Sequence, residues 1–328
     1  MRAFVTGGTG FLGGHVVQKL RQRGDDVVAL VRTPPKATQV RELGCEIVEG
    51  DLSHEDAIPK AVVGCDAVFH VAAMYEVGIP ASRHEEMYDA NVKGTERVLD
   101  ASTDAGVGRI VYVSTVGVFG DTKGKVVDET YDREPTGFMS YYEETKYLAH
   151  ELAKDRIAKG APIVIVQPGG IYGPGDPSVI GTLIGMIRRF GLPFLVFPDA
   201  GFNLVYVEDV ADGILLAHEK GRVGESYVLG GEVMSMRDAL QRICRAAGKR
   251  VPTRVLPAPL MRLSTPVWPV VSRLTGLPPN ARELMANAAA TFYATDAKAR
   301  RELGYAPRDV DAGLTELLAA PPTKETAT

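Results

Sequence analysis

Cysteine and clustered histidine are scarce in this sequence. Its three cysteines, Cys45, Cys65 and Cys244, are an odd number, lie far apart and form no Cys-x-x-Cys pair. This pattern argues against a disulfide framework and indicates reduced thiols, as in a cytoplasmic protein. The six histidines form no His-x-x-x-His or similar cluster, so no metal site is expected. The Gly-x-Ser-x-Gly turn of serine hydrolases and the P-loop are also missing.

The sequence has neither an excess of one charge nor a long apolar run. Lys plus Arg number 37 and Asp plus Glu number 41, which gives a net charge of −4 at pH 7. This balance produces no long-range field that would recruit a nucleic acid or an acidic membrane. No apolar run approaches the ~20 residues that span a bilayer, and the N-terminal MRAFVTGG lacks the apolar region of a signal peptide. We therefore expect a cytoplasmic protein that acts on a small-molecule substrate, with no nucleic-acid partner and no membrane span.

Short β-branched runs alternate with stretches of helical period in the first half of the chain. The expected strands cover residues 3–6, 27–31, 46–49, 67–71, 109–114 and 162–167, and the expected helices 13–23, 38–43, 57–63, 87–105 and 140–159. Such repetition predicts a parallel sheet with right-handed crossovers and helices on both faces. The expected fold class is α/β, a Rossmann-type doubly wound parallel sheet with a smaller C-terminal substrate lobe.

The alternation breaks after Pro168 in a Gly/Pro-rich stretch, PGGIYGPGDPS. An expected helix over 179–190 and a short strand over 192–197 follow it. We expect residues 1–170 to form the Rossmann domain, with 204–229 returning to it, and residues 171–203 and 230–320 to form the substrate-binding lobe. The segment 256–274 is expected to be a lid or substrate-pocket helix rather than a membrane contact, because prolines, Arg262 and Arg273 interrupt it. The polar tail 321–328 is expected to be flexible.

A glycine turn, TGGTGFLG, stands between the first expected strand and the first expected helix. Gly7 is expected to make the tight turn, Gly10 to let the backbone approach a phosphate, and Gly13 to let helix and sheet pack closely. The free N–H groups and the positive helix end favour a pyrophosphate. The sequence therefore predicts that Gly7, Gly10, Phe11, Leu12 and Gly13 bind a dinucleotide.

The second expected strand ends at Val31 and is followed by Arg32 and Lys36. A site for NAD would place an acid here to accept from the ribose 2′-hydroxyl, whereas a cation can bind a 2′-phosphate. NADP(H) is therefore the preferred cofactor. NAD(H) is the alternative if Arg32 and Lys36 are only solvated loop residues. Asp51 and Leu52 follow the third strand, where adenine would lie, and Asp51 is either a ligand of the adenine amino group or a turn residue.

Tyr142 and Lys146 stand four residues apart in SYYEETKYLAHE, so both project from one face of the expected helix. A tyrosine near its ordinary pKa of about 10 is a poor acid or base at neutral pH, and an adjacent ammonium stabilises its phenolate. Tyr142 can then give a proton to a carbonyl oxygen or take one from a hydroxyl. The pair follows a strand that ends in Ser114-Thr115, and a hydroxyl there can orient the reacting oxygen.

Taken in order, several motifs resemble those of the extended short-chain dehydrogenase/reductase family, in its epimerase/dehydratase-related branch. They are TGGTGFLG, Asp51-Leu52, HVAA, NVKGT, VSTVGVFG, Tyr142-x-x-x-Lys146 and PGGIYGPGD. The resemblance covers nearly the whole chain. It implies a catalytic triad of Thr115, Tyr142 and Lys146, in which Lys146 also binds the cofactor ribose.

The same resemblance implies further contacts with the cofactor. Ala72, Ala73 and Asn91 should lie along it, and Pro168 and Ile171 should present backbone to the nicotinamide amide. It also implies a homodimer formed through the helices expected over 87–105 and 140–159.

Two departures from the family's usual sequence argue against its nucleotide-sugar members. Nucleotide-sugar members usually carry Asn in the loop after the sixth strand, where this sequence has Gly170, and Arg before the proline, where it has Gln167. The sequence is instead similar to the dihydroflavonol-reductase and 3β-hydroxysteroid-dehydrogenase-like members. The second lobe includes the apolar residues Met261, Leu263, Trp268, Val270 and Val271. These residues either line a pocket for a lipophilic substrate or simply pack the lobe.

The expected function is hydride transfer between NADP(H) and the carbonyl or secondary alcohol of a small, lipophilic substrate. A sugar epimerase or dehydratase, which returns the hydride to its substrate, is the alternative enzyme, and net cofactor oxidation or reduction separates the two. A non-catalytic protein that senses NADP is a third alternative, because a dinucleotide fold does not itself imply catalysis.

Overall fold

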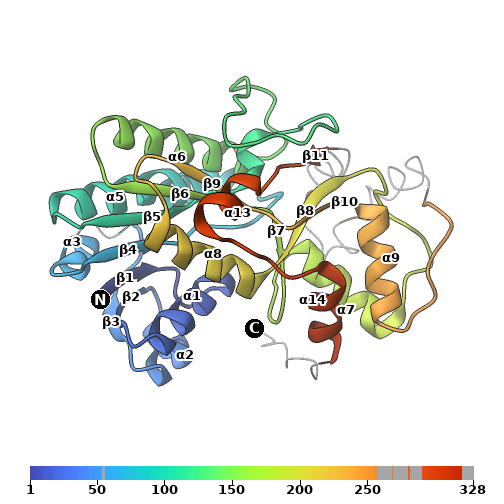
Figure 1. Ribbon diagram of the computed structural model, residues 1–328, viewed down its shortest axis with the longest axis horizontal. Coiled ribbons are helices and arrows are strands. Elements are labelled where there is room, and N and C mark those ends of the chain that lie inside the picture. Colours follow the sequence, from blue (N-terminus) through green and yellow to red (C-terminus); the bar gives the residue numbers. More distant parts are fainter. Residues whose placement is uncertain (54–55, 257–267, 269–279, 281–289, 320–328) are drawn as a thin grey trace.

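The computed structural model of the protein describes residues 1–53, 56–256, 268, 280 and 290–319. Its larger sheet has seven parallel strands in the order β3-β2-β1-β4-β5-β6-β9 (Figure 1). Their bounds are β1 (Arg2–Thr6), β2 (Asp26–Val31), β3 (Glu46–Glu49), β4 (Ala67–His70), β5 (Arg109–Val113), β6 (Ile163–Pro168) and β9 (Ser226–Leu229). The expected Rossmann-type doubly wound sheet is confirmed. The strand order reverses between β1 and β4, and ligands bind at such a point, beyond the carboxyl ends of the strands.

Helices cover both faces of this sheet. One face carries α1 (Phe11–Gln22), α8 (Val207–Lys220) and α13 (Ala297–Leu303), and the other carries α3 (Ala57–Val62), α5 (Gly94–Asp104) and α6 (Tyr141–Ala158). The short α2 (Thr38–Glu42) lies beside β2 through Val40. Along β1, Ala3 and Val5 enter the first core and Phe4 enters the second, as the period of two requires.

The helix expected over 87–105 is interrupted. It consists of α4 (His84–Tyr88), a π-helical turn η3 (Asp89–Lys93) and α5. At the start of α5, Gly94 packs on the loop after β3, where an added Cβ would lie only 2.7 Å from the Cβ of Leu52. A π turn within a helix often marks a functional site, and this one carries Asn91.

A second, smaller sheet follows the first. In it β8 (Gly201–Tyr206) pairs with β7 (Gly170–Tyr172), β10 (Glu232–Ser235) and β11 (Thr291–Phe292). The helices α7 (Val179–Phe190), α9 (Met236–Ala246) and α14 (Val310–Ala319) pack with it around a separate core. The Oγ of Ser178 accepts from the N–H groups of Ile180 and Gly181 and so caps α7.

The expected division into lobes stays a proposal. The strand β8 belongs to the small sheet, although its Val205 also packs in the first core of the large sheet. The strand expected over 192–197 is wrong, since this segment forms only an isolated bridge between Leu195 and Val255, and Pro193 lacks the N–H that a longer ladder needs.

Part of the expected substrate lobe lies outside the described residues. Within the segment 256–274, the structure does not describe residues 257–267 and 269–274, which include Met261, Leu263, Val270 and Val271. The tail 321–328 also lies outside the described residues. In the part of the chain that the structure describes, no helix has the length and apolar character needed to cross a membrane.

Candidate active site

Two glycines at the turn between β1 and α1 have no room for a side chain. Gly7 adopts a φ of +75°, and a Cβ on it would lie 2.8 Å from the backbone nitrogen of Ala72. A Cβ on Gly13 would overlap the carbonyl oxygen of Gly7. The helix α1 begins at Phe11 with Gly10 as its N-cap, has no acidic residue in its first turn, and receives no cap from a described side chain. Its first N–H groups are therefore available to a phosphate, and a pyrophosphate fits this turn.

A buried chain of hydrogen bonds ties the turn to the loop after β4. The Ala72 N–H donates to Oγ1 of Thr6 at 3.2 Å, and this hydroxyl lies 2.7 Å from Nδ1 of His70. Nε2 of His70 lies 3.0 Å from Oγ1 of Thr95, which itself donates to the Asn91 carbonyl. Because the Thr95 hydroxyl donates to Asn91, it accepts from His70, which assigns the imidazole hydrogen to Nε2. Burial lowers the pKa of His70 to about 3, so the ring stays neutral.

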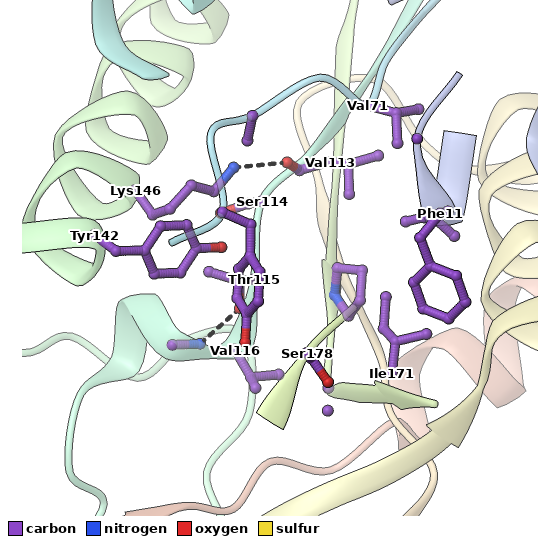
Figure 2. A pocket seen from close by; sticks show the side chains of 18 of the residues that line it. Phe11, Val71, Val113, Ser114, Thr115, Val116, Tyr142, Lys146, Ile171 and Ser178 are labelled. Carbon is purple, nitrogen blue, oxygen red and sulfur yellow. Dashed lines mark hydrogen bonds between the residues drawn. The ribbon is translucent and has the colours of Figure 1, made fainter. Parts of the chain in front are cut away.

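The helix α6 brings Tyr142 into a cavity beside this turn. The Oγ of Ser140 accepts from the third N–H of α6, which fixes the start of the helix and therefore the direction in which Tyr142 projects. In Figure 2 the phenol oxygen of Tyr142 points toward Thr115. Burial, with the neighbouring phenols of Tyr75 and Tyr112, raises the pKa of Tyr142. The lowering of this pKa that we expected from an adjacent ammonium is not seen for the residues of the chain alone.

Lys146 lies one turn further along α6 and is 4% exposed. Its Nζ donates to the carbonyl oxygen of Val113 at 3.0 Å (Figure 2). It also lies 5.2 Å from the centre of the Tyr112 ring. Burial lowers the pKa of Lys146 to about 8. The ammonium therefore remains charged at neutral pH, held by a carbonyl dipole and an aromatic face.

Two hydroxyls at the end of β5 have different partners. The Oγ of Ser114 lies 2.9 Å from Nδ1 of the buried His150. Oγ1 of Thr115 accepts from the Gly117 N–H at 3.1 Å, which leaves the Thr115 hydrogen for a further acceptor. Thr115 can therefore donate to a bound oxygen in the cavity.

A cavity of about 560 Å³ joins these parts, a size that suits a small ligand. Figure 2 shows a part of its lining. Of the predicted site residues it is lined by Gly7, Gly10, Phe11, Leu12, Gly13, Ala72, Ala73, Thr115, Tyr142, Lys146, Pro168 and Ile171. The lining comes largely from the carboxyl ends of β1, β4, β5 and β6 and the segments that follow them, where an open parallel sheet binds its ligands.

Four predicted cofactor residues near β2 and β3 do not line this cavity. Arg32 is exposed directly after β2 and has no salt bridge with a described residue. The backbone of Lys36 ends a 3-10 turn, and its side chain lies outside the described part of the chain. Oδ1 of Asp51 accepts from the Ser53 N–H at 2.8 Å, as expected if Asp51 is a turn residue rather than a ligand of adenine. Leu52 is buried in the core with α5.

Asn91 does not line this cavity either, and its place along the cofactor stays a prediction from the resemblance. The side chain is 2% exposed, and its Oδ1 accepts from the Met74 N–H at 2.7 Å. Its Nδ2 donates to the Met74 carbonyl at 3.1 Å and to Oγ1 of Thr145 at 3.0 Å. Asn91 therefore joins the loop after β4 to α6, one residue before Lys146.

Sequence reasoning missed a large apolar part of the cavity lining, which includes Tyr75, Val77, Val116, Ile180, Phe202 and Phe292. Tyr75 follows the HVAA motif closely, so its position was the one available signal. Phe202 and Phe292 are register partners on β8 and β11, and only this pairing of distant segments brings them together.

Comparisons with known proteins agree with this architecture. Residues 3–230 match the NAD dependent epimerase/dehydratase family. The chain is 34% identical over 318 residues to a 4-hydroxy-2-methyl-3-oxo-4-farnesyl-3,4-dihydroquinoline-1-oxide ketoreductase of Stigmatella aurantiaca, covering 94% of this chain and 92% of that protein. It is 31% identical to a 3β-hydroxysteroid dehydrogenase/Δ5→4-isomerase of Mycobacterium tuberculosis, covering 93% of this chain and 86% of that protein.

Among solved structures, that of gox2253 is similar, with a TM-score of 0.82 and 34% identity over 97% of this chain and 96% of that one. The glycine turn, the Tyr-x-x-x-Lys helix and the parallel sheet are thus accompanied by a family match over more than half of the sequence. The chain therefore belongs to the NAD dependent epimerase/dehydratase family and is an enzyme with the extended short-chain dehydrogenase/reductase fold.

Proposed function

We propose that this enzyme transfers hydride between NADP(H) and the carbonyl or secondary alcohol of a small, lipophilic substrate. The observation that carries the proposal is that Thr115, Tyr142 and Lys146 line the same cavity as the glycine turn. In Figure 2, Thr115 and Tyr142 lie across this cavity from Phe11 and Ile171. A proton donor and a dinucleotide-binding turn that share one cavity are the parts that a carbonyl reductase needs.

The described residues fit a nicotinamide dinucleotide. We propose that the turn containing Gly7 and Gly13 holds its pyrophosphate at the N-terminus of α1, because side chains there would collide with backbone. Ala72 would lie beside the cofactor, and Pro168 and Ile171 would lie at its nicotinamide end. When bound, the nicotinamide supplies or accepts the hydride.

The side chains around the reacting oxygen would move and hold the proton. Because burial raises the pKa of Tyr142, its phenol is protonated at neutral pH and can donate to an oxygen that gains negative charge. The free hydrogen of Thr115 would donate to the same oxygen and orient it. Lys146, with a pKa of about 8, would stabilise the phenolate that Tyr142 becomes.

The lipophilic substrate class is proposed from apolar side chains that line the cavity. Val116, Ile180, Phe202 and Phe292 line it, and burial of such side chains against an apolar ligand is favourable. The name of the Stigmatella aurantiaca relative, a ketoreductase of a farnesyl-bearing compound, supports the same class.

The preference for NADP(H) is proposed from Arg32, which is exposed after β2 and free of described salt bridges. The test is a fluorescence titration of the protein with NADPH and NADH. We expect NADPH to bind at least about tenfold tighter, and Arg32→Ala to remove about 1.4 kcal/mol or more of that preference. Arg250→Ala, which removes an exposed arginine elsewhere, is the control. Equal binding of NADH would show that Arg32 is only a surface cation.

Turnover separates the reductase from its alternatives. Ketones added with NADPH are expected to cause net cofactor oxidation, and Tyr142→Phe is expected to lower its rate by roughly a hundredfold or more. A sugar epimerase or dehydratase would change its substrate without net cofactor oxidation. A protein that only senses NADP would bind the cofactor and turn over neither substrate class, and Tyr142→Phe would leave its biological activity unchanged.

A further inference from the structure

Tyr75 presents an aromatic ring to the cavity. Although 51% of its surface is exposed, it lines the cavity together with Tyr142. The two ring centres lie 5.0 Å apart at an interplanar angle of 86°, an edge-to-face contact. A large aromatic surface left open beside the proton donor is one that a bound ligand can cover.

The backbone that leads to this ring is held by hydrogen bonds. Asn91 binds both the N–H and the carbonyl of Met74, the residue immediately before Tyr75. Ala72 donates to Thr6 in β1. Because Asn91 is buried and also binds Thr145 of α6, the loop that carries Tyr75 is tied to the helix that carries Tyr142. The edge-to-face contact is therefore supported by the hydrogen bonds through which Asn91 joins the two segments that carry the rings.

Further aromatic surface lines the same cavity. Phe202 and Phe292 stand opposite each other on the paired strands β8 and β11, and Val116 and Ile180 add aliphatic surface. Flat rings gain more from packing against such faces than flexible chains do, because a ring loses little conformational freedom when it binds.

On the basis of the reductase function proposed above, we propose that Tyr75 is a specificity-determining residue whose ring packs on a planar ring of the substrate. The substrates are accordingly flat, ring-bearing carbonyl compounds or the corresponding alcohols, in preference to open-chain compounds of the same size. The ring of Tyr75, rather than its hydroxyl, sets this preference.

The test compares 1-tetralone, a flat bicyclic ketone, with 2-decanone, an open-chain ketone of the same carbon number, each with NADPH. The wild type is expected to favour 1-tetralone in kcat/KM. Tyr75→Ala is expected to lose roughly three- to tenfold of that preference, mainly through KM. Tyr75→Phe keeps the ring and is expected to keep the preference. Tyr88→Ala removes a partly exposed tyrosine of α4 that does not line the cavity, and is expected to change neither ketone's kinetics.

Binding of 1-tetralone in the presence of NADP⁺, measured by calorimetry, gives a second readout without turnover, because neither the ketone nor the oxidised cofactor has a hydride to give. It is expected to be weaker in Tyr75→Ala by the same factor. An unchanged ratio of the two ketones in Tyr75→Ala overturns the role of Tyr75 and leaves the reductase function standing. If no ketone causes NADPH oxidation, the reductase function itself fails, and equal 1-tetralone binding by wild type and Tyr75→Ala then removes the role of Tyr75 as well.

Discussion

The hydroxyl of Ser114 lies 2.9 Å from Nδ1 of His150, whereas the adjoining Thr115 accepts from a backbone N–H and keeps its own hydrogen. Two consecutive hydroxyls at the end of β5 therefore have separate tasks. The Ser114 hydroxyl bonds the buried imidazole of His150 in α6. This bond fixes the end of β5 against the helix that carries Tyr142. Thr115 is the hydroxyl that remains for a ligand.

Substitution of each hydroxyl should separate these tasks. Thr115→Ala is expected to lower kcat for ketone reduction by roughly a hundredfold, as loss of a donor to a developing oxyanion does. Ser114→Ala is expected to lower the free energy of unfolding by about 1 kcal/mol and to change kcat only a few-fold, because it leaves one nitrogen of His150 unpaired. Steady-state NADPH oxidation and urea unfolding measure the two effects. Equal losses of kcat in both variants would mean that the hydroxyls share one role.

The buried ammonium of Lys146 should make stability depend on pH. Its pKa is about 8 in the folded protein and ordinarily 10.5. Between these values the unfolded chain keeps a proton that the folded protein has released, so stability rises with pH through this window. Below pH 8 the buried charge costs roughly 3 kcal/mol. Lys146→Met is therefore expected to be more stable than the wild type at pH 7. Its free energy of unfolding is not expected to increase between pH 8 and pH 10.5 as that of the wild type does.

Urea unfolding of both proteins without cofactor, at pH 7 and at pH 9.5, measures this difference. Buried tyrosines contribute equally to both proteins, so only the Lys146 contribution remains in the comparison. Parallel pH profiles would show that Lys146 titrates near its ordinary pKa and that burial has little effect on it.

His70 should make the protein sensitive to acid. Burial lowers its pKa from 6.5 to about 3, so below pH 6.5 the unfolded chain takes up a proton that the folded protein does not. Stability therefore falls as pH drops from 6.5 toward 3. The amide of His70→Gln can still bond Thr6 and Thr95. Between pH 7 and pH 5 this variant should lose roughly 2 kcal/mol less of its free energy of unfolding than the wild type does. Chemical unfolding at both pH values tests this, and equal losses would indicate that the ring is protonated in the folded state.

The large sheet could be predicted because the sequence patterns that specify it each lie within a short stretch of the chain. Each of the first six strands is a short β-branched run, and the spacing of Gly7, Gly10 and Gly13 between a strand and a helix describes one local turn. The Tyr142/Lys146 pair is likewise visible within one helical turn.

The features that escaped prediction depend on residues far apart in the chain. The π turn at Asn91 accompanies hydrogen bonds to Met74, 17 residues away, and Thr145, 54 residues away. Phe202 and Phe292 meet only through strand pairing. The raised pKa of Tyr142 follows from burial, which a helical spacing cannot reveal.

Crowding at the glycine turn gives a last test, with a matched control in the same chain. A Cβ on Gly13 would overlap the Gly7 carbonyl, whereas a Cβ on the exposed Gly185 in α7 meets nothing within 4 Å. Gly13→Ala should therefore push α1 away from the turn and weaken NADPH binding by roughly tenfold or more, since overpacking typically costs about 1 to 3 kcal/mol. Gly185→Ala should bind NADPH normally and gain up to about 1 kcal/mol of stability from its helix propensity. Fluorescence titration and thermal unfolding measure both, and normal NADPH affinity in Gly13→Ala would remove the turn from the proposed cofactor site.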